Sequence, residues 1–578
     1  MSFTPEDLLA RFGLEGFRPG QREAVVAALE GRDSLVVMPT GGGKSLCYQL
    51  PALSDIGLVV VMSPLIALMA DQLRRLRELG VAGVMVASGM AEGEREQALA
   101  EIADGSARLV LAAPERFSSA VFRRTLAARK VGLFVVDEAH CVTEWGHDFR
   151  PDYLCLGDAI ESLGRPAVMA ATATATPRVA REIAARLGLR DPVSIRSGFD
   201  RPNIAFDVVS VEGKGAMARK RAALMSVLRE PQARPAIVYC GTRRDTDKLA
   251  AEIAGEGIAT VAYHAGMSAD ARRASQEAFM GGAAEVVVAT NAFGMGVDKA
   301  DVRTVAHWAL PTSLEAYYQE AGRGGRDGLP ARALLLASRV DLGRLIRFIK
   351  ERETGLDEVR GFVGRLRAGA GEDGVTAVGH GQLGDRERVL LSIAERAGAV
   401  ELSPGGAAGL LVRATGQGEP RIARQAIAAA RERGWESYRS IERYSGEAER
   451  CRRRQILDHF GDNEPGRPSG RCCDVCDPDP RLAAALLDPA VGKRGRRGGS
   501  GRSAPAIEVP ESEFESLRVW RMGRADGKPA FHVASDATLR EILVGRPSSL
   551  SELLEVRGVG PTFCERHGES LLEAVAAL

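Results

Sequence analysis

The sequence predicts an α/β protein in which two parallel-sheet domains precede smaller, mainly helical parts. Up to about residue 345, short apolar runs alternate with helical patterns and are bounded by Gly or Pro. Continuous apolar runs of this kind are typical of parallel strands that helices cover on both faces. Gly and Pro interrupt the pattern in residues 197–203, which indicates two similar halves. Beyond residue 345 the pattern is mostly helical.

The apolar runs supply the predicted strands. They lie at 34–38, 58–62, 109–112 and 133–136 in the first half and at 236–239 and 285–288 in the second. Farther on, a β-like pair at 399–402 and 410–413 is joined by Ser-Pro-Gly-Gly and follows a helical stretch. A helix followed by a hairpin predicts a winged helix.

A basic stretch separates the carboxy-terminal helical residues from the rest of the chain. Residues 488–503 contain Gly-Lys-Arg-Gly-Arg-Arg-Gly-Gly, which is typical of a flexible linker. The predicted domains are two parallel-sheet domains at 1–200 and 201–345, a winged-helix-like domain at 356–418, a cysteine-containing module at 421–480, a linker at 481–510 and a helical domain at 511–578.

The composition is that of folded, soluble domains. Hydrophobic residues make up 45% and charged residues 26% of the chain, unlike the apolar-poor composition of disordered chains. No window approaches the roughly 18 uninterrupted apolar residues of a membrane span, and the start carries acids where a signal peptide needs basic residues. We therefore expect a soluble, intracellular protein with no membrane partner. The net charge of +1 does not decide whether the partner is a polyanion.

A glycine-rich loop follows the first predicted strand and opens a helix. It reads Met-Pro-Thr-Gly-Gly-Gly-Lys-Ser over residues 38–45. In this context backbone N–H groups and a helix N-terminus hold phosphates, although a purely structural turn is the alternative. Lys44 is expected to reach the β- and γ-phosphates of ATP, and Ser45 to hold Mg²⁺. The other predicted nucleotide contacts of the loop are Thr40, Gly41, Gly42 and Gly43.

Two carboxylates and two arginines complete the predicted ATPase. Asp137 and Glu138 directly follow the strand at 133–136, where the first is placed to bind Mg²⁺ and the second to orient the attacking water. A solvated strand end is the alternative for these acids. Arg323 and Arg326 follow a predicted helix of the second half and are placed to neutralise the transferring phosphoryl group. Together these elements predict an ATPase at a two-domain interface.

An ordered set of short stretches resembles the RecQ family of superfamily 2 DNA helicases. They are Gly-Phe-Arg-Pro-Gly-Gln at 16–21, the loop at 38–49, Asp-Glu-Ala-His at 137–140, Trp-Gly-His-Asp-Phe-Arg-Pro at 145–151, and shorter stretches at 62–68, 113–116, 172–174, 199–203, 263–266 and 289–296. The resemblance covers nearly the whole chain. It implies two RecA-like domains with ATP hydrolysis between them, and 3′-to-5′ translocation on single-stranded DNA.

The resemblance also implies roles for single residues. Arg18 and Gln21 are expected to hold the adenine, and Arg326 to act as the arginine finger with Arg323 beside it. Leu14 stands where relatives often have an aromatic ring, so adenine stacking is expected to be weaker here.

An aromatic-rich loop just after the carboxylates is the predicted DNA contact. Aromatic rings and a guanidinium suit stacking on single-stranded bases, and their closeness to Asp137 offers a route from DNA contact to hydrolysis. Core packing is the alternative for such rings. The predicted DNA-binding residues are Trp145, His147, Phe149 and Arg150 of this loop and, in two further matching stretches, Ser63 and Thr290.

A cluster of cysteines resembles the zinc module of the same family. The chain has nine cysteines in 578 residues, which is too sparse for a disulfide-stabilised fold. Four of them cluster between residues 451 and 476, and such clustering indicates a metal site. Four thiolates around Zn²⁺ form a closed structural site. The fourth ligand is Cys472 or His459, and we favour Cys472 because thiolate completes such sets more often. The predicted ligands are Cys451, Cys472, Cys473 and Cys476.

The terminal unit resembles the HRDC domain found at the ends of RecQ helicases. From residue 505 onward there are twelve acids and eight Lys or Arg, a net charge of −4, which disfavours strong DNA binding. We expect a weak DNA binder or a protein-docking module. Most RecQ relatives place a winged helix after the zinc module, whereas the pattern here comes before it. Its wing at 403–409 has no aromatic residue, which argues against a strand-separating pin.

The function predicted from the sequence is an ATP-dependent 3′-5′ helicase acting on single-stranded and branched DNA in recombination and repair. Its expected cofactors are ATP, Mg²⁺ and Zn²⁺. One alternative is an RNA-directed ATPase, which the aromatic-rich loop and the HRDC resemblance disfavour. The other is a non-enzymatic or annealing DNA scaffold, which the intact Lys44, Asp137, Glu138 and Arg326 disfavour. Candidate protein partners are a single-stranded DNA-binding protein and a topoisomerase. The expected location is the bacterial cytoplasm, at the nucleoid.

Overall fold

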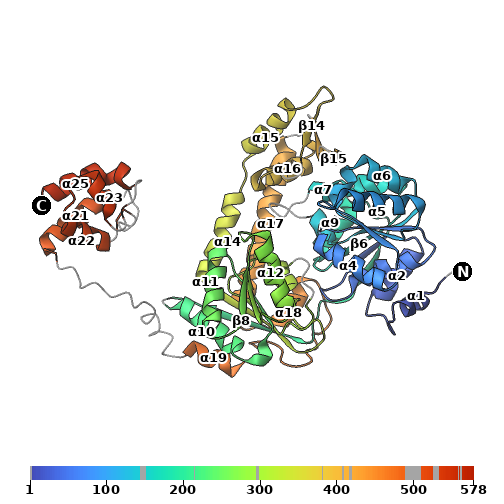
Figure 1. Cartoon of the computed structure of the whole chain (residues 1–578), viewed down its shortest axis with the longest axis horizontal. Helices are drawn as coiled ribbons and strands as arrows, with labels where there is room; N and C mark the ends of the chain where they lie inside the picture. Colours follow the sequence, from blue (N-terminus) through green and yellow to red (C-terminus); the bar gives the residue numbers. More distant parts are fainter. Residues whose placement is uncertain are drawn as a thin grey trace. The chain divides into compact units, whose positions relative to one another are not determined.

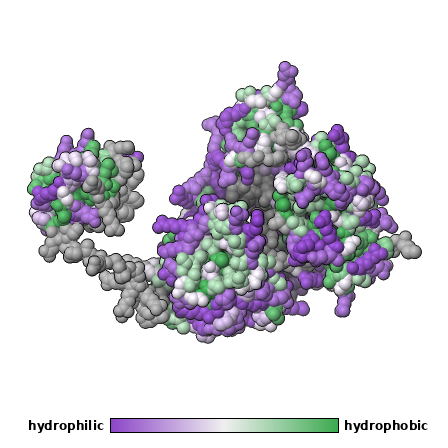
Figure 2. All heavy atoms as spheres, viewed as in Figure 1, coloured by the Kyte–Doolittle hydropathy of each residue, from purple (hydrophilic) through white to green (hydrophobic). Residues whose placement is uncertain are grey.

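The computed structural model divides into two compact units, Met1–Gly492 and Lys493–Leu578 (Figure 1). The structure describes residues 3–64, 66–143, 151–213, 215–294, 299–379, 382–405, 409–415, 420–487, 509–524, 533–534, 536–556, 559 and 563–578. On the face shown in Figure 2, hydrophilic residues predominate and apolar residues form small groups. No helix of the described ranges is long and apolar enough to cross a membrane.

The first sheet domain is a seven-stranded parallel sheet with the order β3-β4-β2-β5-β6-β1-β7. Its strands are β1 (Ser34–Val37), β2 (Leu58–Met62), β3 (Gly83–Val86), β4 (Leu109–Ala112), β5 (Val131–Val136), β6 (Ala167–Thr172) and β7 (Val193–Arg196). Its helices are α1 (Pro5–Arg11), α2 (Gln21–Leu29), α3 (Lys44–Gln49), η1 (Pro51–Leu53), α4 (Ile66–Glu78), α5 (Glu92–Asp104), η2 (Pro114–Ser118), α6 (Ala120–Ala127), η3 (Ala139–Val142), α7 (Pro151–Leu154), α8 (Leu156–Ser162) and α9 (Pro177–Arg186).

The second sheet domain is a six-stranded parallel sheet with the order β10-β11-β9-β12-β13-β8. Its strands are β8 (Ile204–Val211), β9 (Ala236–Tyr239), β10 (Thr260–Tyr263), β11 (Val286–Ala289), β12 (Thr304–His307) and β13 (Ala331–Ser338). Its helices are α10 (Ala216–Leu228), η5 (Pro231–Ala233), α11 (Arg243–Ala254), α12 (Ala269–Met280) and α13 (Leu314–Ala321).

Both sheets are covered on their two faces, as continuous apolar strands require. In β2, Val60 packs into one core and its neighbours Val59 and Val61 into another. In β9 the same alternation assigns Val238 and Tyr239 to different cores. The predicted α/β class with two parallel sheets is therefore confirmed, and the carboxyl ends of the strands of each sheet meet at one edge.

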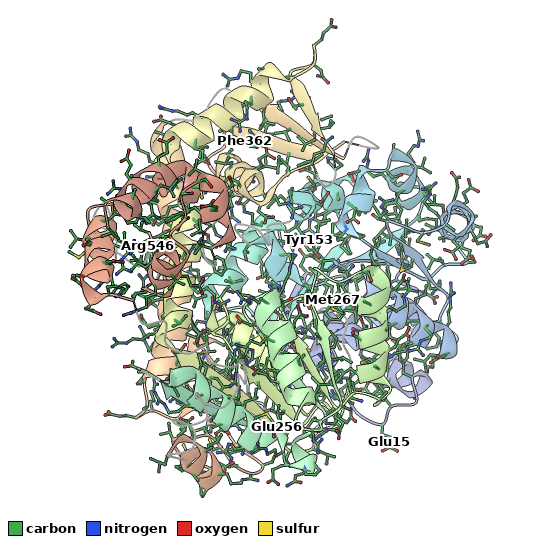
Figure 3. The ribbon with its side chains drawn as sticks, turned by 60° about the vertical axis from the view of Figure 1, so that its left-hand side comes forward. Glu15, Tyr153, Glu256, Met267, Phe362 and Arg546 are labelled. Carbon is green, nitrogen blue, oxygen red and sulfur yellow. The ribbon has the colours of Figure 1, made fainter. Side chains whose placement is uncertain are left out.

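A small helical unit with an antiparallel sheet follows α14 (Arg339–Arg352). Its elements are α15 (Leu356–Ala368), β14 (Val375–Val378), α16 (Asp385–Arg396), β15 (Val400–Pro404) and β16 (Leu410–Ala414), and we call them the inserted unit. The sheet has the order β14-β16-β15. Its core contains Phe362, labelled in Figure 3, and Leu391. The predicted hairpin is present as β15 and β16, and β14 is an additional strand.

The inserted unit docks on the first sheet domain through ion pairs and buried contacts. Cys155 of the first sheet domain is buried in the core of the unit, and the Ser118 hydroxyl donates to the Gly409 carbonyl at 2.8 Å. Glu182 of α9 binds Arg396 of α16 at 2.6 Å and Arg433 of the following helix at 2.7 Å. Arg186, one turn farther along α9, binds Glu395 at 2.7 Å. Burial would raise the pKa of Glu182, but hydrogen bonds from the two arginines outweigh it and lower the pKa overall.

The chain then continues through α17 (Pro420–Gly446), α18 (Arg452–His459) and α19 (Pro480–Leu487). The prediction placed 481–487 in a flexible linker, but these residues form most of α19. Leu482 is buried in the core of the second sheet domain, next to residues of α10. The apolar Leu-Ala-Ala-Ala-Leu-Leu stretch explains the difference, because it gives this helix an apolar face to bury.

The second unit is helical. Its elements are α21 (Glu511–Met522), α22 (Asp536–Gly545), α23 (Leu550–Glu555), η9 (Cys564–Gly568) and α25 (Glu569–Ala576). Leu517, Leu539, Leu553 and Leu571 are fully buried in one core.

Candidate functional site

The glycine-rich loop joins β1 to α3 and needs its glycines. Gly41 and Gly43 have φ angles of 82° and 80°, which side chains disfavour. A Cβ on Gly42 would lie 2.9 Å from the carbonyl oxygen of Pro39. Lys44 Nζ crosses the loop and donates to the Met38 carbonyl at 3.1 Å. The lysine and the loop backbone are therefore held in one compact turn, as phosphate binding requires.

Arg18 and Gln21 contact this loop directly. Arg18 Nη1 donates to the Gly41 carbonyl at 2.6 Å. Gln21 Nε2 donates to the carbonyls of Gly42 at 3.2 Å and Gly43 at 3.1 Å. The backbone N–H of Arg18 donates to Gln21 Oε1 at 2.8 Å, which joins the two residues. Their predicted role at the adenine stays a prediction, and in this structure they brace the loop.

The carboxylates follow β5 at the same sheet edge. The Asp137 N–H donates to the Met62 carbonyl at 2.8 Å, and the Asp137 side chain is buried. Glu138 has a φ of 49°, and its N–H donates to Asp137 Oδ1 at 3.0 Å. Burial raises the pKa of Asp137, the Glu138 charge raises it further, and Lys44 opposes the shift. A solvated strand end does not fit a buried acid beside a strained backbone.

Neighbouring side chains extend this polar network. Glu138 Oε2 lies 3.3 Å from His140 Nδ1, which lies 2.9 Å from Thr172 Oγ1 at the end of β6. Ser45 Oγ accepts a hydrogen bond from Gln72 at 3.2 Å. Tyr153 of α7, labelled in Figure 3, donates to the Asp137 carbonyl at 3.1 Å. Residues Asp137 and Glu138 are thus connected, through side chain or backbone, to η3, β6 and α7 of the first sheet domain.

The two predicted arginines have different surroundings. A Cβ on Gly41 would lie 3.7 Å from Arg326 Cγ, so Arg326 reaches the glycine-rich loop from the second sheet domain. Arg323 is buried and hydrogen-bonds Tyr239. A Cβ on Gly294 would lie 2.9 Å from Arg323 Nη2. Of the two, Arg326 has the position expected of a finger, and Arg323 packs within its own domain.

Arg201 is a site residue that the sequence reasoning missed. Its Nη1 donates to the Thr40 carbonyl at 3.0 Å and to the Gly322 carbonyl at 2.8 Å, and its Nη2 donates to the Gly324 carbonyl at 2.9 Å. It therefore joins the glycine-rich loop to the turn that carries both arginines. The available signal was its place in the matching stretch at 199–203.

The four predicted cysteines meet in one cluster. The ligand atoms of Cys451, Cys472, Cys473 and Cys476 all lie within 4.8 Å of one another. Cys451 Sγ is 3.7 Å from Cys472 Sγ and 4.0 Å from Cys473 Sγ. Tetrahedral Zn²⁺ with Zn–S bonds of about 2.3 Å requires sulfur separations of about 3.8 Å, so the donor set fits a zinc site. His459 instead contacts Glu315 Oε1 at 2.7 Å.

The zinc module holds the segment between the two sheet domains. Phe460 stacks on Phe199 with ring centroids 4.4 Å apart. Arg453, which is 2% exposed, pairs with Asp200 and donates to the carbonyls of Arg201 at 2.9 Å and Ile204 at 2.6 Å. The module thus fastens the segment that carries Arg201.

The same module also extends the second sheet. The Phe206 N–H donates to the Cys472 carbonyl at 3.0 Å, and Phe206 forms a bridge with Cys473. Phe206 belongs to β8, the edge strand of that sheet. The cysteine knuckle therefore pairs with the edge of the sheet.

The predicted DNA residues are only partly described. Trp145, His147, Phe149 and Arg150 lie outside the described residues. Thr290 lines a cleft of about 2310 Å³ in the first unit, and Ser63 is buried at its side-chain oxygen. Pro64, next to Ser63, lines the same cleft.

Comparison with known families defines the class of protein. Residues 18–183 match the DEAD/DEAH box helicase family, and residues 219–328 match the helicase conserved C-terminal domain. The two sheet domains therefore form a helicase core. Residues 417–477 match the RecQ zinc-binding family, and residues 511–575 match the HRDC domain. The chain belongs to the RecQ family, which confirms the resemblance, the Cys₄ zinc site and the HRDC region.

Relatives differ in how much of their length matches. The ATP-dependent DNA helicase RecQ of Pasteurella multocida is 39% identical over 350 residues, which cover 60% of this chain and 54% of the relative. The chain thus spans about half the length of that protein. The probable ATP-dependent DNA helicase RecS of Bacillus subtilis is 38% identical, with 62% of this chain and 72% of the relative covered.

A solved structure supports the fold. The crystal structure of the DUF1998 helicase MrfA bound to DNA has a TM-score of 0.50 and 17% identity, and covers 73% of this chain and 63% of that chain. At this identity the likeness concerns the fold alone.

Proposed function

We propose that the protein is an ATP-dependent DNA helicase that moves 3′-to-5′ on single-stranded DNA and unwinds duplex or branched DNA in recombination and repair. One observation carries the proposal. The glycine-rich loop of the first sheet domain, whose Lys44 acts on the buried Asp137, lies beside Arg326 of the second. An ATPase site divided between two domains converts nucleotide binding and release into relative movement of those domains.

Each residue has a role in this proposal. Lys44 and the loop N–H groups hold the phosphates, and Ser45 and Asp137 hold Mg²⁺. Bound Mg²⁺ would neutralise phosphate charge. Glu138 orients the attacking water and accepts its proton. Arg326 stabilises the charge that develops on the transferring group. Arg201 holds the glycine-rich loop next to the turn that begins at Gly322 and carries Arg326.

The first test is hydrolysis. Purified protein should release phosphate from ATP faster when single-stranded DNA is added. Lys44→Ala should abolish hydrolysis because it removes the phosphate contact. Arg326→Ala should lower hydrolysis by about 10³-fold or more. An unchanged rate in Arg326→Ala would move the finger role elsewhere.

The second test is strand displacement with labelled duplexes. A duplex with a 3′ single-stranded tail should be unwound, and one with a 5′ tail should not. Stimulation by RNA in place of DNA would favour the RNA-directed ATPase. DNA binding without hydrolysis would favour the scaffold. The candidate protein partners and the cytoplasmic location remain predictions.

A further inference from the structure

The cleft in the first unit has a wall that the nucleotide site does not use. The wall is formed by α14 and α17, and Thr290 lines the same cleft. On α14, Phe348 lines the cleft between Arg344 and Arg352, each four residues away. Residues four apart share one face of a helix, so an aromatic ring lies between two guanidinium groups on this wall.

Phe348 is exposed enough to serve as a stacking platform, that is, a ring face on which a base can stack, and is not a core residue. It is 37% exposed, unlike the fully buried rings of the sheet domains. The guanidinium carbons of Arg344 and Arg352 each lie 5.8 Å from its ring centroid. Arg344 also donates to the Leu310 carbonyl at 2.5 Å, which fixes one side of the ring against the second sheet domain. An exposed, supported ring is suited to stacking.

Further basic side chains line the same cleft as Phe348. Arg388, Arg424 and Arg431 line the same cleft and form no ion pair with a described residue. A Cβ on Gly434 would lie 3.7 Å from Ile349, so α17 approaches α14 closely there. Arg431 is one turn away from Gly434 on α17. The acid Glu436 on this wall is paired with Arg178 at 2.9 Å.

We propose that this wall binds single-stranded DNA, with one base stacked on Phe348 and backbone phosphates contacted by Arg352, Arg388, Arg424 and Arg431. An aromatic ring beside arginines that pair with no described acid is the combination that holds single strands with little sequence preference. The inference rests on the proposed function and extends it, because the strand would continue from Thr290 along a wall made by α14 and α17.

Fluorescence tests the stacking directly on the full chain. Phe348→Trp should show quenching by a dT oligonucleotide beyond that of the wild type, whose four tryptophans supply the background. Val340→Trp is the matched control, since Val340 lies on the same helix and is 78% exposed. Its fluorescence should not change beyond the background. Equal quenching in both variants, or none in Phe348→Trp while the oligonucleotide is bound, overturns the inference.

Binding measurements give a second readout. Phe348→Ala should weaken dT binding by about 5- to 100-fold, as expected for one stacked base. Arg424→Ala and Arg431→Ala should each lower the dependence of log affinity on log salt by about one. Arg347→Ala is the control, because Arg347 is exposed on α14 and pairs with Glu351 at 2.6 Å. Unaltered affinity in Phe348→Ala at an unchanged melting temperature overturns the inference.

The two proposals fail separately. A wild-type protein that binds the oligonucleotide without hydrolysing ATP contradicts the proposed function. The quenching experiment still tests whether a base stacks on position 348 in that case. A protein that hydrolyses ATP with DNA stimulation but shows no quenching at position 348 contradicts only the proposed stacking on Phe348.

Discussion

The zinc module and the inserted unit both contact the first half of the chain, but by different means. The zinc module is attached through buried groups, namely the stacked rings of Phe460 and Phe199 and the guanidinium of Arg453. The attachment of the inserted unit also includes partly exposed ion pairs of Glu182 and Arg186, whose partners lie on α16 and α17.

The two attachments differ in how easily water reaches their interactions and replaces them. Buried stacking and hydrogen bonds are lost only when the surrounding core opens. Water reaches the partly exposed ion pairs of Glu182 and Arg186 more easily, and salt and acid weaken them. We therefore expect the zinc module to stay fixed to the segment between the sheet domains. We expect the attachment of the inserted unit to be the one that salt and acid weaken more.

The largest expected effect is loss of zinc. Cys476→Ser should remove the metal and unfold the knuckle, with a free-energy cost on the order of 10 kcal/mol. Metal analysis and calorimetry check this outcome. Cys564→Ser is the control, since Cys564 lies in the second unit.

Cys472→Ser is the sharper variant for the same site. Zinc content should fall here as well, because Cys472 is part of the cluster and His459 is held by Glu315. Full zinc content and an unchanged melting temperature in this variant would contradict the Cys₄ assignment.

The next effect concerns Arg453. Arg453→Met should lower the free energy of unfolding by about 3 to 5 kcal/mol, because Asp200 is left without its buried partner. Chemical denaturation measures the change. Arg450→Met is the control, since the Arg450 side chain is 50% exposed and pairs with Asp458. Similar losses in both variants would show that the buried contacts of Arg453 stabilise the protein no more than the exposed Arg450 pair does.

A smaller effect is expected for Glu182→Gln, about 2 kcal/mol at neutral pH. The folded pKa of Glu182 is lowered from its ordinary value of 4.5. Its stabilisation is therefore present above that value and is lost as pH falls through the lowered pKa. Melting temperatures of the variant and the wild type should converge in acid. A difference that stays constant down to pH 3 would contradict the ionic attachment.

The smallest effect is expected for Arg178→Ala. Arg178 and Glu436 join α9 to α17 at 2.9 Å, but their side chains are 53% and 46% exposed. We expect a loss of less than about 1 kcal/mol, which 0.5 M salt should remove. Thermal melts at low and high salt measure it. A loss as large as that of Glu182→Gln would contradict the expected difference between partly buried and exposed ion pairs.

Local sequence was enough for the parts of the site that are contiguous in the chain. The glycine-rich loop and Asp137 with Glu138 each lie within a few residues of a strand end, so strand patterning places them. Cys451 and Cys476 were found because clustered thiols indicate a metal. The same reasoning correctly assigned two parallel sheets, because apolar runs between helices allow few other arrangements.

Contacts between residues far apart in the chain could not be predicted from the sequence. Arg201 contacts Thr40, which is 161 residues away, and no local pattern marks that pairing. Leu482 was assigned to a linker because basic residues follow it, yet its burial depends on α10. Phe348 had a usable signal in the arginines four residues to each side, but only the fold shows that this face lines a cleft.

The pairing of the cysteine knuckle with β8 has a consequence for solubility. An uncovered edge strand presents unpaired N–H and C=O groups to other chains and promotes aggregation. Seven of the eight residues from Ile204 to Val211 are buried, and the knuckle pairs with Phe206 near one end of this strand. Metal loss would uncover that part of the edge. We therefore expect the zinc-free protein to form intermolecular β-structure, so that chelation at high protein concentration ends in precipitate instead of a soluble unfolded module.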